Sequence, residues 1–358
     1  MKSLIVNAPS GAYEVRVENG LITEIGRHLT GILPTQTRIM VIADRNVGKL
    51  YGDKVVESLI GAGYDFRVFN IPPGEMQKSL GMYAQLFDVL LMMGIDRTSA
   101  LVALGGGVVG DLVGFVAATF MRGVPFVQVP TSLLAQVDSS VGGKVAVNHP
   151  VVKNLVGTFY QPVVVLADPQ VLYTLPNEEY VAGLGEVVKY GMIRSLELFA
   201  YLEQRHDAVL SLDPRALEHV VSTCIAIKAD IVAADEREKG LRAILNFGHT
   251  VAHALEAATA YSKFRHGEAV AIGLMCETRL AVKLGLAAPE VEDRLGALLG
   301  WLGLPTKQSH VQPDQLVHLM LLDKKVSAGR MRFALPKAIG EAIVVDDVKT
   351  PDVLTALG

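Results

Sequence analysis

An alternation of short apolar strands and longer helical patterns in the first half of the chain constrains the fold most strongly. Helical periodicity covers residues 51–62 and 80–93. The strand-like runs around these helices lie at residues 38–44, 66–69, 100–104, 126–129 and 163–166. Strands that alternate with helices are typical of βαβ units, and continuous apolar runs suit a parallel sheet that is covered by helices. We therefore expect an α/β fold for this half.

Strand signals become sparse after Pro176, where long amphipathic patterns begin. Apolar residues that recur at helical spacing predict helices that each bury one face. The patterns cover residues 178–193, 214–234, 250–260 and 268–284. We expect a Rossmann-like α/β domain over residues 1–176, followed by an all-α domain over residues 177–358.

Composition narrows the classes of function. The chain has 358 residues, of which 50% are hydrophobic, and a net charge of −4 with Lys and Arg spread along its length. This charge pattern gives no electrostatic footprint for nucleic acid, and no apolar run is long enough to suggest a membrane span. Cys224 and Cys276 both fall in periodic apolar stretches and are expected to be buried packing residues. We expect a cytoplasmic protein that binds small molecules.

A glycine motif follows one of the predicted strands. Residues 105–111 read Gly-Gly-Gly-Val-Val-Gly-Asp, which contains G-x-G-x-x-G, and a helical pattern comes next. Glycines allow close approach of a pyrophosphate to a helix N-terminus, but a tight and closely packed turn explains the motif about as well. No acidic residue ends a strand about 20 residues later, whereas Asp44 ends an earlier one and could hold a ribose. Glu75 and Lys78 are further polar candidates.

A histidine cluster indicates a metal site. His249 and His253 are four residues apart, so both rings would lie on one face of a helix. Because catalytic zinc commonly takes three protein ligands from His and Glu, Glu186, His249 and His266 form a candidate set. Thr250 stands where the HExxH motif of metalloproteases needs glutamate, which argues against a peptidase.

The chain also carries several cations in glycine-rich or amide-rich surroundings. The long polar segment over residues 130–148 contains Lys144, and Lys153 lies beside Asn154. Long polar loops commonly carry function, although any single lysine is more often a solvated surface residue. Lys228, Arg242 and the Lys324–Lys325 pair have similar settings, so an anionic substrate is expected.

In these motifs the chain resembles the 3-dehydroquinate synthase family of sugar-phosphate cyclases. The resemblance covers nearly the whole length. It is carried by residues 105–111, 120–123, 130–148, 185–191, 235–253 and 266–270. The resemblance implies an NAD- and zinc-dependent enzyme that converts 3-deoxy-D-arabino-heptulosonate 7-phosphate to 3-dehydroquinate and phosphate in the shikimate pathway. The implied steps are transient oxidation, phosphate elimination, reduction, ring opening and intramolecular aldol closure.

The resemblance also implies roles for individual residues. Zinc, with Co2+ as an alternative, would be bound by Glu186, His249 and His266. Arg122 would reach the phosphate site of a partner subunit, which implies a homodimer. Substrate would be contacted by Lys144, Lys189, Lys228, Arg242, Asn246, His253, Asp138, Asn154, Lys324 and Arg122. The NAD site would be lined by Asp44, Glu75, Lys78, Gly105, Gly106, Gly107, Val108, Asp111, Thr131, Ser132, Asp138, Lys144, Lys153, Thr174, Leu175 and Glu179.

Two positions depart from the usual pattern of the family. Ser132 replaces a common Thr but keeps the hydroxyl, whereas Val152 replaces a common Gly and restricts the backbone beside Lys153.

Three other functions stay open. They are a cyclase for another sugar phosphate, a metal- and NAD-dependent polyol dehydrogenase, and a noncatalytic phosphate-binding module. The last leaves the histidine cluster unexplained.

Overall fold

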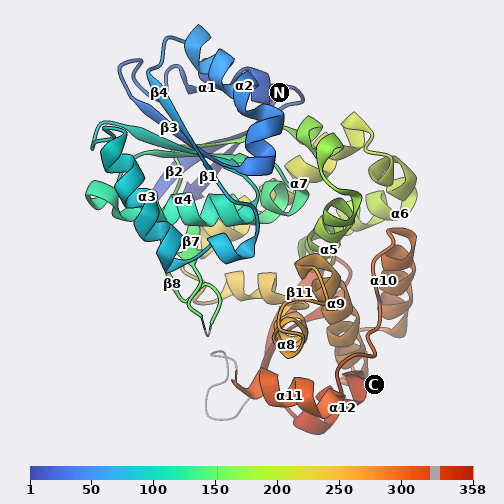
Figure 1. The fold of residues 1–358 in the computed structure, drawn as a ribbon. Coiled ribbons are helices and arrows are strands. Elements are labelled where there is room, and N and C mark those ends of the chain that lie inside the picture. The colour runs from blue at the N-terminus through green and yellow to red at the C-terminus, as the bar shows by residue number, and fades with distance from the viewer. Residues whose placement is uncertain (151, 323–330, 358) are drawn as a thin grey trace. The chain divides into compact units, whose positions relative to one another are not determined.

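The chain folds into two compact units in a computed structural model that describes all residues except 151, 323–330 and 358 (Figure 1). The first unit contains Met1–Leu175 and Leu217–Arg237, and the second contains Pro176–Ala216 and Glu238–Gly358. Residues 217–237 thus belong with the first unit, although the sequence-based boundary at residue 176 assigns them to the second domain. That boundary between functional domains stays a prediction.

A seven-stranded sheet forms the centre of the first unit, in the order β1-β2-β9-β6-β5-β3-β4. All neighbouring strands pair in parallel except β1 with β2, which pair antiparallel at one edge. The strands are β1 (Lys2–Ala8), β2 (Gly11–Val17), β3 (Ile39–Asp44), β4 (Phe66–Ile71), β5 (Ala100–Gly105), β6 (Phe126–Pro130) and β9 (Val164–Ala167). The predicted α/β fold is confirmed, whereas the hairpin β1–β2 was not predicted.

Helices cover both faces of this sheet, as Figure 1 shows. Side chains alternate along each strand, so Val41 packs toward α1 (Ile25–Leu29) and α2 (Arg45–Gly61), while Met40 packs toward α3 (Leu80–Met92) and α4 (Gly107–Thr119). Both residues are buried. Burial on both faces explains why the strands read as continuous apolar runs.

The segment after β6 is more regular than a loop. A π-helical turn covers Ala135–Ser139, and β7 (Lys144–Val147) pairs antiparallel with β8 (Val156–Phe159). Helix α7 (Pro214–Ala234) falls almost wholly in the first unit. The polar segment 130–148 is therefore partly built into secondary structure, which fixes the positions of its side chains.

The second unit is mainly helical, as expected, but it is not all-α. A two-stranded antiparallel sheet, β10 (Met331–Ala338) and β11 (Glu341–Val348), was not predicted. The helices are α5 (Asn177–Arg194), α6 (Leu196–Leu210), α8 (His249–Ala258), α9 (His266–Lys283), α10 (Pro289–Trp301), α11 (Pro313–Leu322) and α12 (Thr350–Leu357), with a short 3-10 helix at Leu241–Asn246. Helix α9 packs against α5, α8, α10 and α12, so it is the central helix of this unit.

Helices α5 and α9 approach closely because both carry glycine at their contact. A Cβ on Gly267 would lie 1.7 Å from the carbonyl oxygen of Ala182, and a Cβ on Gly185 would lie 2.4 Å from the carbonyl oxygen of Gly267. Any other residue would push the helices apart. Glu186 follows Gly185 and His266 precedes Gly267, so the contact between the two helices fixes the distance between Glu186 and His266.

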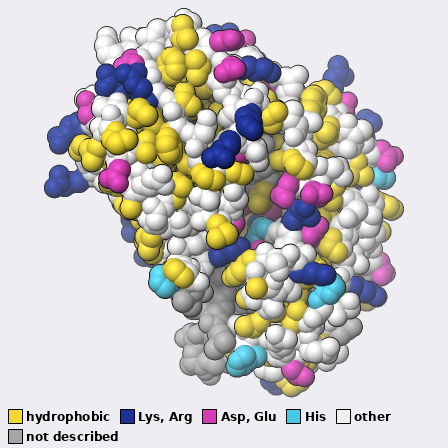
Figure 2. All heavy atoms as spheres, viewed as in Figure 1, with side chains coloured by type: hydrophobic (Ala, Val, Ile, Leu, Met, Phe, Trp, Pro, Cys, Tyr) yellow, Lys and Arg dark blue, Asp and Glu magenta, His cyan; other side chains and the backbone are white. Residues whose placement is uncertain are grey.

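The charged side chains at the surface and the two cysteines lie where the composition and sequence pattern predict. Lys and Arg side chains lie among Asp and Glu side chains on the face shown in Figure 2. Cys224 and Cys276 are both buried, as predicted. Among the described residues, no helix is both long and apolar enough to cross a membrane.

Asp168 gives a test of the first unit's stability. Its buried carboxylate accepts hydrogen bonds from the backbone N–H groups of Gly20 (2.9 Å), Ile22 (3.0 Å) and Gln170 (2.9 Å). Asp168→Ala leaves these donors without their acceptor and is expected to lower the free energy of unfolding by about 3 kcal/mol. Denaturant unfolding measures the change. The exposed Asp53→Ala in α2 is the control and should stay within about 0.5 kcal/mol of the parent protein. Equal stability of the two variants would contradict the prediction.

Candidate active site

The three predicted metal ligands meet in the second unit. Glu186 lies within α5, His249 is the first residue of α8, and His266 is the first residue of α9. One ligand atom from each lies within 4.8 Å of the others. The side chain of Glu186 is fully buried, whereas those of His249 and His266 are 13% and 32% exposed. The group is therefore closed on the glutamate side and accessible on the histidine side.

Outer hydrogen bonds orient both rings. Nδ1 of His249 lies 3.1 Å from the carbonyl oxygen of Phe247, and Nδ1 of His266 lies 3.3 Å from Oε1 of Glu256. Both partners are acceptors, so each Nδ1 is the donor and each Nε2 points to the ligand position. The two Nε2 atoms lie 3.3 and 3.4 Å from the same atom, Oε1 of Glu186.

The electrostatics of the group are set by burial and by two charged neighbours. Lys189, one turn after Glu186, makes an ion pair with it. Burial is the largest single effect and acts to raise the pKa of Glu186, but the Lys189 ammonium together with His249 and His266 outweighs it and holds that pKa well below its ordinary value. Burial lowers the pKa of His249 to about 4. Burial also acts to lower the pKa of His266, but Glu186 and Glu256 raise it to about 10.

These residues fit a divalent cation. Contacts of 3.3 and 3.4 Å are long for a charge-assisted hydrogen bond, which is usually about 2.7–2.9 Å. Oε2 of Glu186 faces the Lys189 ammonium, whereas Oε1 faces the two imidazole nitrogens without a well-aligned hydrogen bond to either. Two imidazole nitrogens and one carboxylate oxygen form a donor set that catalytic zinc uses, with one coordination position left open. The three side chains are thus better matched to a shared cation than to one another.

His253 lies beside this group. Its ring centroid is 5.5 Å from that of His249 and 6.4 Å from that of His266. A spacing of four residues turns a helix by about 400°, so both histidines of α8 face the same side. Val251 is turned about 200° from His249 and lines a separate cavity instead.

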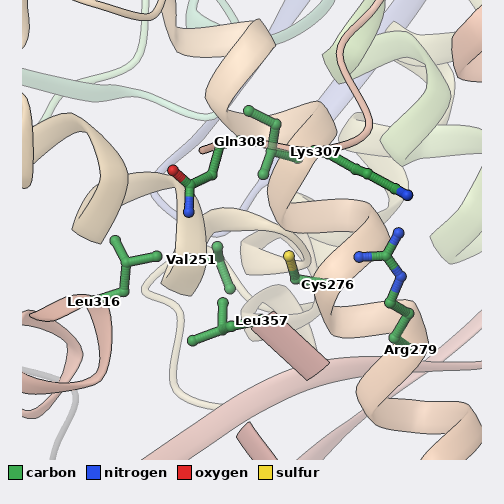
Figure 3. Close-up of a pocket in the computed structure, with 8 residues that line it drawn as sticks. Val251, Cys276, Arg279, Lys307, Gln308, Leu316 and Leu357 are labelled. Atoms are coloured by element: carbon green, nitrogen blue, oxygen red, sulfur yellow. The ribbon is translucent and has the colours of Figure 1, made fainter. Parts of the chain in front are cut away.

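That cavity is not the candidate site. Figure 3 shows Val251, Leu316 and Leu357 on one side of it and the charged ends of Arg279 and Lys307 on the other. None of the predicted site residues lines it.

A second cluster of predicted residues forms in the first unit, around Lys78. The buried Lys78 ammonium makes an ion pair with Asp111 in α4 and donates to Oδ1 of Asn154 at 2.5 Å. Burial raises the pKa of Asp111 although Lys78 acts in the opposite direction. Segments that are far apart in sequence thus converge next to the glycine motif, as parallel strands require when their carboxyl ends share one edge.

Asn148 joins this cluster and was missed as a site residue. Its backbone N–H donates to the carbonyl oxygen of Lys78 at 2.8 Å, and its side-chain amide donates to Oε1 of Glu75 at 2.7 Å. Its Oδ1 accepts from the backbone N–H of Asn154 at 2.9 Å. Asn154 has a φ of 53°, a conformation that Asn tolerates better than most residues. An asparagine at the end of the polar segment 130–148 was the available sequence signal.

The glycine motif forms the turn that leads into α4. Gly106 precedes the first residue of α4, and a Cβ there would lie 3.4 Å from Oγ of Ser132. A Cβ on Gly110 would lie 2.7 Å from the side chain of Gln128, so this glycine allows close packing. The turn is therefore tightly packed on one side and borders the predicted Thr131–Ser132 segment on the other.

Three other predicted residues make hydrogen bonds outside these clusters. Asp138 accepts from Lys228 of α7 through its backbone oxygen at 2.6 Å and its Oδ1 at 2.9 Å. Asp44 caps α2 by accepting from the backbone of Asn46 and Val47. Thr174 shares a hydrogen bond with Tyr51 at 2.6 Å.

The other predicted residues differ in their exposure to solvent. Arg242 is buried in the 3-10 helix Leu241–Asn246, and Asn246 donates to Glu238 at 2.5 Å. Glu179 is at the surface in an ion pair with Arg265. Lys144 is exposed at the start of β7, Lys153 is half-buried, Arg122 is exposed with a φ of 70°, and Leu175 ends the first segment of the first unit. Lys324 and Lys325 lie outside the described residues.

Metal binding tests the assignment of His249 and His253. His249→Ala and Glu186→Gln each remove one of three ligands and are expected to weaken zinc binding at least 100-fold, because the remaining two donors do not complete the site. Competition with a chromophoric chelator measures the affinity. His253→Ala is the matched control, and its zinc affinity should stay within about threefold of the parent protein. A larger loss in His253→Ala than in His249→Ala would reverse the two assignments.

Comparison with known proteins matches the whole chain. Residues 68–182 match the family described as 3-dehydroquinate synthase N-terminal, and residues 183–326 match 3-dehydroquinate synthase C-terminal. A 3-dehydroquinate synthase from Desulforamulus reducens is 45% identical over 358 residues, which cover 100% of this chain and 99% of that protein. Another, from Dehalococcoides mccartyi, is 45% identical over 357 residues, with the same coverage.

Solved structures of two related enzymes share the fold. A 2-epi-5-epi-valiolone synthase from Streptomyces hygroscopicus, solved with NAD+ and Zn2+, has a TM-score of 0.89 at 29% identity and covers 96% of this chain and 95% of its own. A 2-deoxy-scyllo-inosose synthase, solved with carbaglucose-6-phosphate, NAD+ and Co2+, has a TM-score of 0.89 at 25% identity and covers 99% of both chains. Identity to the two 3-dehydroquinate synthases exceeds identity to these two structures, and the chain belongs to the 3-dehydroquinate synthase family.

Proposed function

We propose that this protein is a 3-dehydroquinate synthase, which converts 3-deoxy-D-arabino-heptulosonate 7-phosphate to 3-dehydroquinate and phosphate. The observation that carries the proposal is the Glu186–His249–His266 group, in a chain that aligns over its full length with enzymes of this name. The reaction belongs to the carbon–oxygen lyases, because phosphate leaves by elimination.

Zinc and NAD are the proposed cofactors. Glu186, His249 and His266 would hold zinc, and the glycine edge of the first unit would hold NAD. When bound, they supply a Lewis acid that polarises a substrate hydroxyl and a reversible acceptor for its hydride. Among this chain's own residues, Glu256 and the carbonyl of Phe247 hold the ligand rings in place, and Lys189 compensates the buried charge of Glu186.

Roles in substrate binding are proposed for polar groups in each unit taken by itself. In the second unit, Lys189, Arg242, Asn246 and His253 would hold the carboxylate, ring oxygens and phosphate, and Lys324 shares the phosphate role. In the first unit, Lys144 and Asn154 would face the phosphate, and the Asp138–Lys228 pair would face the diol and carboxylate. The NAD site would be lined by Asp44, Glu75, Lys78, Gly105, Gly106, Gly107, Val108, Asp111, Thr131, Ser132, Asp138, Lys144, Lys153, Thr174, Leu175 and Glu179.

A cyclase for a different sugar phosphate is the second candidate. It is favoured by the close fold match to a 2-epi-5-epi-valiolone synthase and a 2-deoxy-scyllo-inosose synthase. Identity of 45% to 3-dehydroquinate synthases, against 29% and 25% to those enzymes, ranks it lower. The buried cations Lys189, Lys228 and Arg242 also suit a substrate with a carboxylate.

A homodimer and a cytoplasmic location are proposed together with this activity. A homodimer would let Arg122, exposed at the end of the 3-10 helix after α4, reach the phosphate site of a partner subunit. A cytoplasmic location fits a biosynthetic enzyme of this family.

Phosphate release in the presence of NAD and zinc tests the activity. With the seven-carbon keto-acid phosphate as substrate, one phosphate is expected per substrate without accumulation of NADH, because the hydride returns to the product. A colorimetric phosphate assay and absorbance at the NADH band are followed together. Accumulation of NADH without phosphate would instead indicate a polyol dehydrogenase. Turnover of only a carboxylate-free sugar phosphate would indicate the second candidate.

Asn148→Ala tests the proposed NAD site. The substitution removes the side-chain contacts to Glu75 and Asn154, both of which lie around Lys78, and is expected to weaken NAD binding about tenfold, equivalent to about 1.4 kcal/mol. Calorimetry or fluorescence titration with NAD measures the dissociation constant. Asn7→Ala, at an exposed position of β1, should leave it unchanged. Unchanged NAD affinity in Asn148→Ala would remove this residue from the site.

A further inference from the structure

A buried carboxylate on α9 holds the first turn of the helix that carries His249. Glu277 is fully buried, and its Oε2 accepts a hydrogen bond from the backbone N–H of Gly248 at 2.6 Å. Its Oε1 accepts from the backbone N–H of Val251 at 3.4 Å. These two donors flank His249 in the chain, so the carboxylate constrains the backbone on both sides of that residue.

Glu277 replaces the cap that α8 lacks. Gly248 occupies the N-cap position of α8 and has no side chain with which to accept a hydrogen bond from the first turn. In a capping box the donors at the N-cap and at the third helical residue are satisfied within the helix itself. Here one carboxylate from a neighbouring helix accepts from both, and its negative charge lies at the positive end of the α8 dipole.

Gly248 is restricted to glycine by its conformation and by the proximity of α9. Its φ is 80°, in the left-handed region that favours glycine. A Cβ on Gly273 would lie 1.9 Å from the carbonyl oxygen of Gly248, so Gly273 lets this turn lie against α9. The turn that precedes His249 is therefore fixed by a backbone contact at Gly273 and by the hydrogen bonds of Glu277.

Helical spacing places these groups on the same side of α9 as the third ligand. Gly273 and Glu277 follow His266 by seven and eleven residues, which correspond to rotations within about 20° of two and three full turns. One face of α9 thus supplies a metal ligand at its start and, further along, the two groups that hold the turn before His249. The separation of the two histidines is set along this single helix.

We propose that Glu277 is a positioning residue of the metal centre, which acts on His249 through the backbone of α8. The inference rests on the proposed metal site and adds a residue that controls its geometry. Glu277 touches neither metal nor substrate in this role. Its loss shifts His249 relative to Glu186 and His266.

Metal affinity and the spectrum of bound Co2+ test this role without a measurement of activity. Glu277→Gln keeps the side-chain shape but places an amide N–H group against a backbone N–H donor. We expect zinc affinity, measured by chelator competition, to fall about 10- to 100-fold, as is usual for residues that orient metal ligands. The visible absorption bands of the Co2+-loaded protein are expected to shift, because the position of His249 changes. Glu277→Asp keeps the charge and should recover part of the affinity, and it serves as the test variant if Glu277→Gln does not fold.

Ser195→Ala separates positioning from a general loss of stability. Ser195 caps α6 in the same unit by accepting from the backbone N–H of Leu198 at 3.1 Å, and its loss costs about 1 kcal/mol of stability. This control should lower the thermal midpoint and leave zinc affinity and the Co2+ spectrum unchanged. Parent-like affinity and spectrum in a folded Glu277 variant would show a purely structural cap and overturn the inference. Failure of the parent protein itself to bind zinc or Co2+ would overturn the metal site and the inference together.

Discussion

Burial of the Glu186 carboxylate is the constraint on which the second unit depends. An ionised carboxylate that is removed from water costs several kcal/mol unless cations and hydrogen-bond donors compensate it. Lys189 compensates one side of Glu186, and two imidazole nitrogens surround one of its oxygens at distances too long for strong hydrogen bonds. A divalent cation between the three ligands would replace these weak contacts with coordination bonds. The polar core of this unit is therefore arranged for a metal rather than for stability alone.

The backbone of α5 and α9 makes this arrangement possible. Side chains normally keep helix axes 8–10 Å apart. At Gly185 and Gly267 the absence of Cβ atoms lets the two backbones touch, and the residues next to these glycines are Glu186 and His266. Two candidate ligands from helices far apart in sequence are thus held by main-chain packing, which is stiffer than side-chain packing. The third candidate ligand, His249, is held by a comparable glycine contact between Gly248 and Gly273.

The sequence predicted the elements whose patterns are strong and local. The five parallel strands β3, β4, β5, β6 and β9 and the helices α5, α7, α8 and α9 were found close to their observed bounds, because apolar runs and helical periodicity record burial directly. The β1–β2 hairpin and the β10–β11 sheet were missed. In β1 only two of seven residues are buried, so the apolar pattern is weak. The three candidate ligands were identified, and they meet in one group.

Contacts between distant segments could not be predicted from the sequence. The resemblance placed Glu75, Lys78 and Asp111 in the NAD site and Asn154 at the substrate, but nothing in their spacing predicts that Asn148 joins them. The same holds for Glu256 and Glu277, which read as ordinary polar positions of amphipathic helices. Their roles depend on which helix face turns toward the neighbouring helix, and that orientation follows from tertiary packing.

The two units stabilise their polar groups in different ways, and this difference matches the chemistry that each is proposed to support. Around Lys78 the contacts are mostly hydrogen bonds among amides, backbone groups and one ion pair, and they link loops at the edge of a sheet. Such a network can rearrange its hydrogen bonds when a cofactor with many polar atoms binds. Around Glu186 the groups lie on helices whose backbones touch, so ligand positions change little. A metal centre requires that rigidity, because its affinity depends on donor positions to within a fraction of an ångström.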